Sequence, residues 1–234
     1  MKSTADYVKE VARFFGSQLD SSLVEVYQLG SLAHGGFSSI YSDIDIGILL
    51  NCEAPPPGIG ALIETAKHMD SEYGKKLSVF WGNPDCDWGR LPALDRLDLL
   101  DHGIPLVYNR KAEFSRPEKA QIHGELLNSI ERSWKPRIDE LRILTALTPA
   151  QRKPYIRAIL YPARLIYSWD CFAVDSNDHA VEYLRVIKPP GLDLQPIALA
   201  LECRRGYCAA EDVFSLQIDL DKQFNETMAY ISKR

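Results

Sequence analysis

The chain of 234 residues lacks long apolar runs, and it is not dominated by glycine or proline, which number 14 each. No segment approaches the roughly 18 consecutive apolar residues of a membrane-spanning helix, and residues 1–10 lack the apolar core of a secretory signal. We therefore expect neither a membrane partner nor export. Hydrophobic residues make up 46% of the chain, which excludes collagen-like and disordered classes and suffices for a buried core.

Basic residues are also too few to form a polyanion-binding surface. Lysine and arginine total 27 against 32 aspartates and glutamates, a net charge of −5, and no basic cluster stands out. This disfavours sequence-independent binding to DNA or RNA. The cysteines are odd in number and none shows C-x-x-C spacing, which is typical of free thiols in a reducing cytoplasm. They are Cys52, Cys86, Cys171, Cys203 and Cys208.

The first half of the chain alternates strand-like and helix-like segments. β-branched runs predict strands over residues 23–29, 44–50, 77–81 and 104–108. Apolar residues at three- and four-residue steps predict helices around residues 8–15, 59–73 and 91–102. We expect Gly103 to end the last of these in a left-handed conformation. This half is therefore predicted to be mixed α/β.

The second half shows helical patterns alone. A polar stretch over residues 109–119 is the expected linker, and helices are predicted over 117–145, from Pro149 after Thr148, from Ser176 to Val186, over 196–205 and near the end of the chain. The predicted class is α+β, with a mixed α/β domain at 1–112 and an all-α bundle of four or five helices at 113–234.

The pattern that carries chemistry begins at the second predicted strand, in the sequence SDIDIGILL. Because strand side chains alternate between faces, Asp43 and Asp45 project together while Ile44 points to the core. Adjacent carboxylates repel each other unless a cation neutralises them, and Mg²⁺ is the hard divalent ion that oxygen ligands favour. A solvated D-x-D is the simpler alternative, which strands on both sides of the motif make less probable.

The first predicted strand ends at Gly30-Ser31, eleven residues before the aspartate pair. Glycine allows a ligand to approach the backbone closely, and Ser31 offers phosphate oxygens a hydroxyl and a backbone N–H. A simple turn would need no ligand. Combined with the aspartate pair, however, Gly30 and Ser31 predict a site for a metal-bound nucleoside triphosphate.

Gly30-Ser31, Gly35-Gly36 and residues 42–46 (SDIDI) resemble the signature of the polymerase-β-type nucleotidyltransferase superfamily. Within it, their spacing is similar to that of the aminoglycoside adenylyltransferases of the streptomycin and spectinomycin type. Residues 163–167, 176–184 and 199–207 resemble the helical domain of that family, although each also fits ordinary helix packing. The resemblance thus spans nearly the whole chain and identifies residues 1–112 as a nucleotidyltransferase domain.

The resemblance implies transfer of AMP from ATP to a hydroxyl of a small acceptor, with release of pyrophosphate. Asp43 and Asp45 would be the catalytic Mg²⁺ ligands. The nucleotide-binding residues would be Gly30, Ser31, Ser42, Asn177 and Tyr207. The family suggests an aminoglycoside-like acceptor and antibiotic resistance, and the net charge of −5 weakly favours a cationic one. The sequence does not indicate an oligomeric state.

Two positions depart from the family pattern. Ser78 stands where a third carboxylate is expected to act as general base, a role worth about 10² to 10⁴ in rate. Asn177 stands where the relatives have a lysine. Asp85 or Glu182 could supply a relocated base or contact the acceptor. The alternative is a catalytically impaired nucleotide-binding or regulatory protein. Transfer to a polynucleotide is disfavoured by the acidic charge, with weak binding to a tRNA end left open.

Other polar residues are open to structural interpretations. His34 lies between the two halves of the motif, where it could contact phosphate or be an ordinary surface histidine. Asp95, Asp98 and Asp101 recur at three-residue steps, which is typical of a solvated helix stripe, and we assign no metal to them. Glu182 fits an exposed helix carboxylate slightly better than a role at the acceptor or as a base.

Overall fold

The structure is a computed structural model that describes residues 3–83, 89–108 and 115–234. Contacts divide it into two compact units. The first, here the α/β unit, comprises Met1–Phe37 and Ser42–Pro117, and the second, the helical unit, comprises Ser38–Tyr41 and Glu118–Arg234. The predicted boundary at residue 112 lies outside the described residues.

A mixed sheet of five strands forms the centre of the α/β unit, in the order β4-β3-β2-β1-β5. The strands are β1 (Leu23–Leu29), β2 (Ile44–Leu50), β3 (Leu77–Gly82), β4 (Gly89–Arg90) and β5 (Ile104–Tyr108). β2 and β3 pair in parallel, and the other neighbours pair antiparallel. The four predicted strands are confirmed. β4 was not predicted because two residues are too few for a periodic signal.

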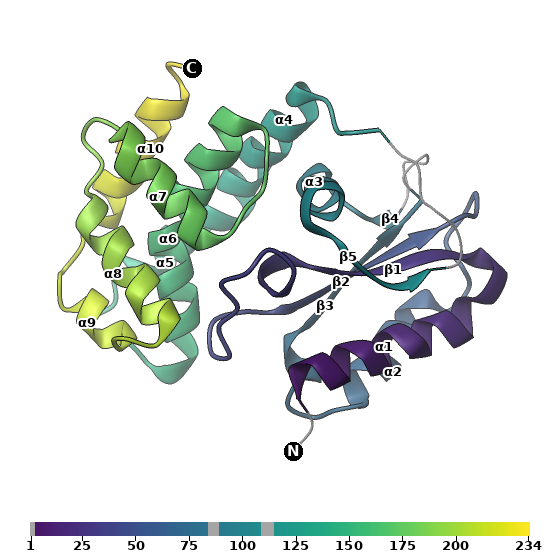
Figure 1. Cartoon of the computed structure of the whole chain (residues 1–234). Coiled ribbons are helices and arrows are strands. Elements are labelled where there is room, and N and C mark those ends of the chain that lie inside the picture. The colour runs from purple at the N-terminus through teal and green to yellow at the C-terminus, as the bar shows by residue number, and fades with distance from the viewer. Residues whose placement is uncertain (1–2, 84–88, 109–114) are drawn as a thin grey trace. The chain divides into compact units, whose positions relative to one another are not determined.

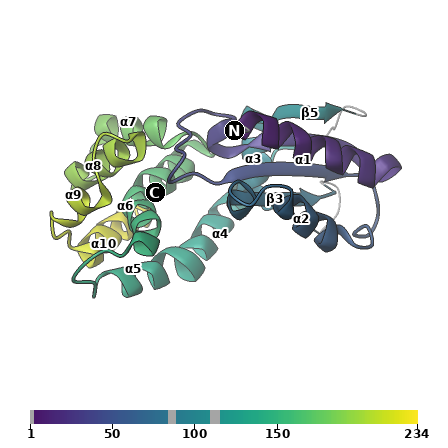
Figure 2. The ribbon, with the colours of Figure 1, turned by 90° about the horizontal axis from the view of Figure 1, so that it is seen from below.

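Helices cover both faces of this sheet (Figure 1). α1 (Thr4–Leu19) and α2 (Ile59–His68) lie on one face and α3 (Ala93–His102) on the other, as the second view also shows (Figure 2). Ile44 and Ile46 are fully buried in the core beneath α1. Leu49 belongs instead to a second core with Leu99 of α3. Since strand side chains alternate, the odd-numbered positions of β2, including Asp45, face the α3 side.

Two predicted helix ends need correction. α2 ends at His68 rather than residue 73, because Gly74–Lys76 form a separate 3₁₀ turn before β3. Gly103 is not left-handed, since its φ is −55°. A Cβ there would lie 2.4 Å from the carbonyl oxygen of Leu99, so this position requires glycine for space. A glycine in a sequence can be there for its access to positive φ or for its lack of a Cβ, and the sequence pattern does not distinguish the two.

Residues 118–234 are all described, and they form more helices than the four or five expected. They are α4 (Lys119–Ser129), a π-helical turn (Ile130–Trp134), α5 (Lys135–Leu141), α6 (Pro149–Cys171), α7 (Asn177–Ile187), α8 (Leu194–Arg205), α9 (Ala210–Phe214) and α10 (Leu220–Ile231). The predicted helix starts at Pro149 and after Ser176 are confirmed, the latter with the Ser176 hydroxyl accepting from the N–H of His179.

Two further sequence features have counterparts in the described residues. α8 begins two residues before the predicted start because Asp193 caps it, accepting a hydrogen bond from the N–H of Gln195. The four cysteines within the described ranges are all free thiols, and Cys86 lies outside these ranges. Within the same ranges, no helix is both long and apolar enough to cross a membrane.

Candidate functional site

The predicted metal-binding aspartates lie at the start of β2. Asp43 precedes the strand and Asp45 is its second residue, and both are partly buried, whereas Ile44 and Ile46 are 0% exposed. The alternation expected from the sequence is therefore present. β2 is the central strand of the sheet, so its core-facing isoleucines fix the register that places Asp45 on the α3 side.

Strand register brings Ser78 directly beside Asp45. The two residues are partners in the parallel β2–β3 ladder, and Leu29 is the partner of Asp45 on β1. Registered neighbours in a sheet project their side chains to the same face. The structure thus places a hydroxyl at the position where the family resemblance leads us to expect a third carboxylate.

Gly30 is held against the carboxylate of Asp45. Its φ of +62° belongs to the left-handed region, and it opens a 3₁₀ turn, Gly30–Leu32, directly after β1. A Cβ on Gly30 would lie 2.3 Å from Oδ2 of Asp45. Two independent constraints, conformation and space, therefore exclude a side chain at this position.

The hydroxyl of Ser31 lies close to the end of the second motif. It donates a hydrogen bond of 2.9 Å to the hydroxyl of Ser42, which is buried beside the start of β2. The carbonyl of Gly30 accepts from the N–H groups of Ala33 and His34 at 2.8 and 3.0 Å. The Gly-Ser turn and the SDIDI segment are thus joined by a side-chain hydrogen bond as well as by the β1–β2 ladder.

Asp98 belongs to this site, which sequence reasoning missed. It is 6% exposed, and its Oδ2 accepts a hydrogen bond of 2.6 Å from the N–H of Gly30. The interpretation of Asp95, Asp98 and Asp101 as one solvated stripe is therefore wrong for Asp98. A signal was available, because Asp98 lies four residues after Leu94 and next to the fully buried Leu97, on the inner side of α3.

His34 faces Asp98 rather than solvent. Its Nε2 lies 3.8 Å from Oδ1 of Asp98, and both side chains are 8% exposed. The His34 ring also lies edge-on to that of His102, with 5.4 Å between centroids. The surface interpretation of His34 is thus wrong, and its side chain belongs to the support behind the Gly30 turn.

The predicted residues of the helical unit occupy one end of α7 and α8. Asn177 is the first residue of α7, and Tyr207 follows α8 and is 78% exposed. Arg205 ties these ends together, because its Nη2 lies 2.6 Å from Oδ1 of Asp178. Asn177 and Tyr207 therefore flank an ion pair that fixes their elements to each other.

The candidates for a relocated base differ in what the structure says of them. The side chain of Glu182 is 61% exposed and pairs with Arg185 of the same helix at 3.2 Å. That is the arrangement of an ordinary surface carboxylate. Asp85 lies outside the described residues. Among the described residues, no group of three or more histidines, cysteines, aspartates or glutamates is arranged to hold a metal ion.

Other titratable groups of the helical unit hold their protons tightly. Burial, followed by a hydrogen bond with Cys203, raises the pKa of Tyr41, whose hydroxyl lies 3.1 Å from the Cys203 sulfur. Burial, followed by the neighbouring Cys203, raises the pKa of Cys208 to about 11. Neither the phenol nor the Cys208 thiol is therefore ionised at neutral pH, and neither can act there as a base.

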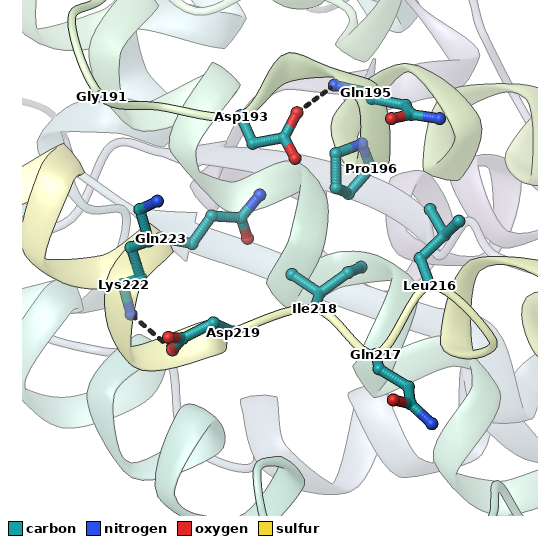
Figure 3. A pocket seen from close by; sticks show the side chains of 10 residues that line it. All are labelled: Gly191, Asp193, Gln195, Pro196, Leu216, Gln217, Ile218, Asp219, Lys222 and Gln223. Atoms are coloured by element: carbon teal, nitrogen blue, oxygen red, sulfur yellow. Dashed lines mark hydrogen bonds between the residues drawn. The ribbon is translucent and has the colours of Figure 1, made fainter.

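A cavity of about 260 Å³ lies within the helical unit, beside the first turns of α8 and α10 (Figure 3). Its two carboxylates already have structural roles, because Asp193 caps α8 and Asp219 caps α10 by accepting from the backbone N–H of Lys222. Gln223 also lines it and is 4% exposed. None of the predicted site residues lines this cavity, so it is not the predicted nucleotide site.

No family model matches the chain, and no curated protein matches its sequence. Among solved structures, the chain is similar to the crystal structure of spectinomycin adenyltransferase AAD(9) from Enterococcus faecialis with ATP and spectinomycin, with a TM-score of 0.70 and 15% identity. The match covers 97% of this chain and 100% of that one. At this identity the similarity shows the fold alone, and the α+β fold of that structure agrees with the fold class predicted from the sequence.

Proposed function

We propose that this protein is a Mg²⁺-dependent nucleotidyltransferase that moves AMP from ATP to a hydroxyl of a small acceptor. The observation that carries the proposal is the close approach of Gly30 to Asp45, where a Cβ would lie 2.3 Å from the carboxylate oxygen. A left-handed glycine whose backbone lies against a partly buried aspartate brings the Gly-Ser turn and the carboxylate together, as binding of one phosphate and its cation by both would require.

The residues present fit a magnesium ion. Asp45 is partly buried at the start of β2, and Asp43 provides a second partly buried carboxylate two residues away, on the same side by strand alternation. Two carboxylates are an ordinary protein contribution to a Mg²⁺ site, since this ion usually completes its shell with water and substrate phosphates. Bound there, Mg²⁺ would neutralise charge on the triphosphate.

The remaining chemistry depends on the chain's own residues. The acceptor hydroxyl oxygen forms a bond to the α-phosphorus, the bond from that phosphorus to pyrophosphate breaks, and the hydroxyl proton must leave. The Ser31 hydroxyl and its partner Ser42 are suited to orient the phosphates. The family resemblance implies nucleotide-binding roles for Asn177 and Tyr207 as well. Ser78 cannot accept the proton at neutral pH, so the proton would pass to water or to another group.

The acceptor class follows from charge and from the structural neighbour. The neighbour's crystal structure contains spectinomycin as well as ATP. With a net charge of −5, this chain would favour a cationic, hydroxylated molecule of aminoglycoside type. Screening amino sugars and aminocyclitols for acceptor-dependent release of pyrophosphate would test that class.

A second candidate is a nucleotide-binding protein that no longer transfers. The register of Ser78 with Asp45 favours it, because a hydroxyl replaces the general base. Both candidates predict nucleotide binding, and they differ in turnover. Phosphorus NMR of the protein with Mg²⁺, ATP and acceptor distinguishes them, since only a transferase forms pyrophosphate and an AMP ester.

Calorimetric titration with Mg²⁺·ATP tests what the two candidates share. We expect saturable binding that requires Mg²⁺ and weakens at least about a hundredfold in Asp45→Asn, since that change removes one of two proposed metal ligands. Glu182→Gln is the matched control, because Glu182 is an exposed carboxylate paired within its own helix. Equal affinities of wild type and Asp45→Asn would contradict the proposal.

A further inference from the structure

Asp98 is a buried carboxylate at the motif that no predicted role uses. It lies in the middle of α3, its side chain is 8% exposed, and its Oδ2 accepts from the N–H of Gly30 at 2.6 Å. In the described part of the chain, its Oδ1 has no hydrogen bond, and Nε2 of His34 lies 3.8 Å away. Burying a carboxylate with so few hydrogen bonds costs stability, so its presence here needs a reason other than stability.

The reason for a buried Asp98 is the position of the hydrogen bond that it accepts from Gly30. The β1–β2 ladder ends at the pair of Leu29 and Asp45, so Gly30 is the first residue beyond it. Gly30 must nevertheless hold a φ of +62° to keep its backbone against Asp45. A hydrogen bond from its N–H to an acceptor oxygen held in the interior fixes the peptide plane at this point.

The same hydrogen bond determines which N–H groups of the turn can donate to a phosphate. Because the N–H of Gly30 points to Asp98, it is not a phosphate donor in this conformation. Phosphate contacts from the turn must then come from Ser31 and the residues after it. Gly30 thus lies between two carboxylates, with Asp98 on its N–H and Asp45 beside its Cα, and only the second faces the proposed metal site.

We propose that Asp98 is the positioning residue of this nucleotide-binding turn, holding Gly30 in the left-handed conformation that keeps the backbone against Asp45. Its role rests on the proposed function, because it is exerted on ATP binding. His34 lies on the other side of the carboxylate, with its Nε2 3.8 Å from Oδ1. The essential property of Asp98 is its acceptor oxygen at this place, so a neutral acceptor of the same shape retains the role.

Three variants separate the acceptor from the charge. Asp98→Asn keeps an acceptor oxygen and removes the charge, whereas Asp98→Ala removes both. Asp98→Glu keeps the charge but displaces the oxygen by one methylene, and it replaces the alanine variant if that one fails to fold. The matched control is Asp101→Ala, which removes a carboxylate from the next turn of α3 that pairs with Arg116 at 2.6 Å instead of the motif.

Two readouts are measured on each variant. The first is hydrogen exchange of the Gly30 amide, followed by NMR of protein labelled with ¹⁵N-glycine, and it needs no nucleotide. The second is the Kd for Mg²⁺·ATP by calorimetry. We expect Asp98→Ala and Asp98→Glu to speed Gly30 exchange and raise the Kd about tenfold or more. Asp98→Asn should stay within about threefold of wild type, and Asp101→Ala should change neither readout.

The outcomes keep this proposal distinct from the proposed function. If the Kd of Asp98→Ala equals that of wild type while its melting temperature falls, Asp98 is merely structural and the inference is wrong. If Asp98→Asn binds as weakly as Asp98→Ala, the acceptor role is likewise overturned. If wild type itself binds no Mg²⁺·ATP, the proposed function fails, and the Gly30 exchange of the variants alone then decides whether Asp98 positions the turn: unchanged exchange in Asp98→Ala overturns the inference.

Discussion

The Gly-Ser and SDIDI motif and the predicted residues of the helical unit are positioned by different means. At the motif, Asp45 is fixed by strand register on both sides, and Gly30 is fixed by Asp98 behind it and Asp45 beside it. In the helical unit, Asn177 and Tyr207 lie at helix ends, and Tyr207 is 78% exposed. One set is held by strand register and a buried hydrogen bond, whereas the other lies at helix ends, where Asn177 is partly buried and Tyr207 is exposed.

The difference teaches where this chain can tolerate change. A residue held by register and buried hydrogen bonds alters its neighbours when it is replaced, because the packed interior transmits strain. An exposed residue at a helix end can change while the fold stays intact. The motif keeps the residues of the family pattern that the chain resembles, whereas Asn177, partly buried at an end of α7, departs from that pattern. Ser78 is the exception, since it departs from the pattern within the sheet.

The largest expected effect is on the rate of transfer, and it comes from placing a carboxylate at position 78. Because Ser78 is the register partner of Asp45, Ser78→Glu would place a carboxylate beside the proposed metal site. We expect the rate of pyrophosphate release to rise about a hundredfold if the missing base limits turnover, within the range for general-base assistance. Single-turnover kinetics with a fixed acceptor would measure it.

The control for this change is Ser78→Gln, which adds a similar volume without the charge. A third carboxylate also repels Asp43 and Asp45 when no cation is present. Ser78→Glu should therefore lower the melting temperature in EDTA and recover it with Mg²⁺, while Ser78→Gln shows no such recovery. An unchanged rate in Ser78→Glu, with this Mg²⁺ response present, would mean that another group is already the base or that the site no longer transfers.

The next effect separates two reasons for a glycine at position 30: its positive φ and the lack of space for a Cβ beside Asp45. Gly30→Ala meets both a positive φ and the carboxylate of Asp45, whereas Gly35→Ala meets a φ of +92° with nothing within 4 Å. The left-handed conformation costs an alanine about 1 to 2 kcal/mol. We expect both variants to lose that much free energy of unfolding by urea denaturation, and Gly30→Ala to lose more and to weaken Mg²⁺·ATP binding about tenfold.

Gly35→Ala should leave nucleotide affinity close to that of wild type. If the two alanine variants weaken binding equally, the effect is one of loop conformation, and the contact between Gly30 and Asp45 carries no special weight. If neither does, the nucleotide does not use this turn. Gly60→Ala is a further reference, because Gly60 lies in α2 with open space around its Cα.

Sequence patterns predicted the sheet better than they predicted the support of the site. The strands at residues 23–29, 44–50 and 104–108 agree residue by residue, because β-branched runs and the alternation around Asp45 are local signals. The apolar residue four positions before Asp98 indicates the inner side of α3, but no local pattern indicates its partner Gly30, which lies 68 residues away in sequence. Spacing within one helix carries no information about such a partner.

The helical unit shows the same limit at its helix boundaries. Ser176 and Pro149 were recognised as helix starts because capping and first-turn preferences are local. The single helix expected near the end of the chain is two, α9 and α10, since apolar spacing alone does not reveal the break between Phe214 and Leu220. The sequence also did not indicate that Ser38–Tyr41 belongs to the helical unit. That assignment depends on long-range contacts, such as the one between Tyr41 and Cys203.

The smallest expected effect is a loss of folding stability at alkaline pH. Both units should show it, because each contains a buried tyrosine with a raised pKa. Burial, and then the charge of Asp70, raises the pKa of Tyr7 in the α/β unit from 10.0 to about 12, and burial raises that of Tyr155 in the helical unit to the same value. Between pH 10 and 12 the folded protein keeps protons that the unfolded chain releases. Stability present below pH 10 is therefore lost as the pH rises towards 12.

Phenylalanine substitutions should flatten this loss in each unit separately. Tyr7→Phe also removes the hydrogen bond of 3.0 Å to the carbonyl of Ala66, so it should cost about 0.5 to 1.5 kcal/mol at pH 7.5. At pH 11.5 that deficit should shrink or reverse, and Tyr155→Phe should follow the same trend. Urea unfolding at both pH values measures it. If the deficit of Tyr7→Phe is the same at both pH values, the phenol titrates alike in the folded and unfolded states, and the alkaline loss has another source.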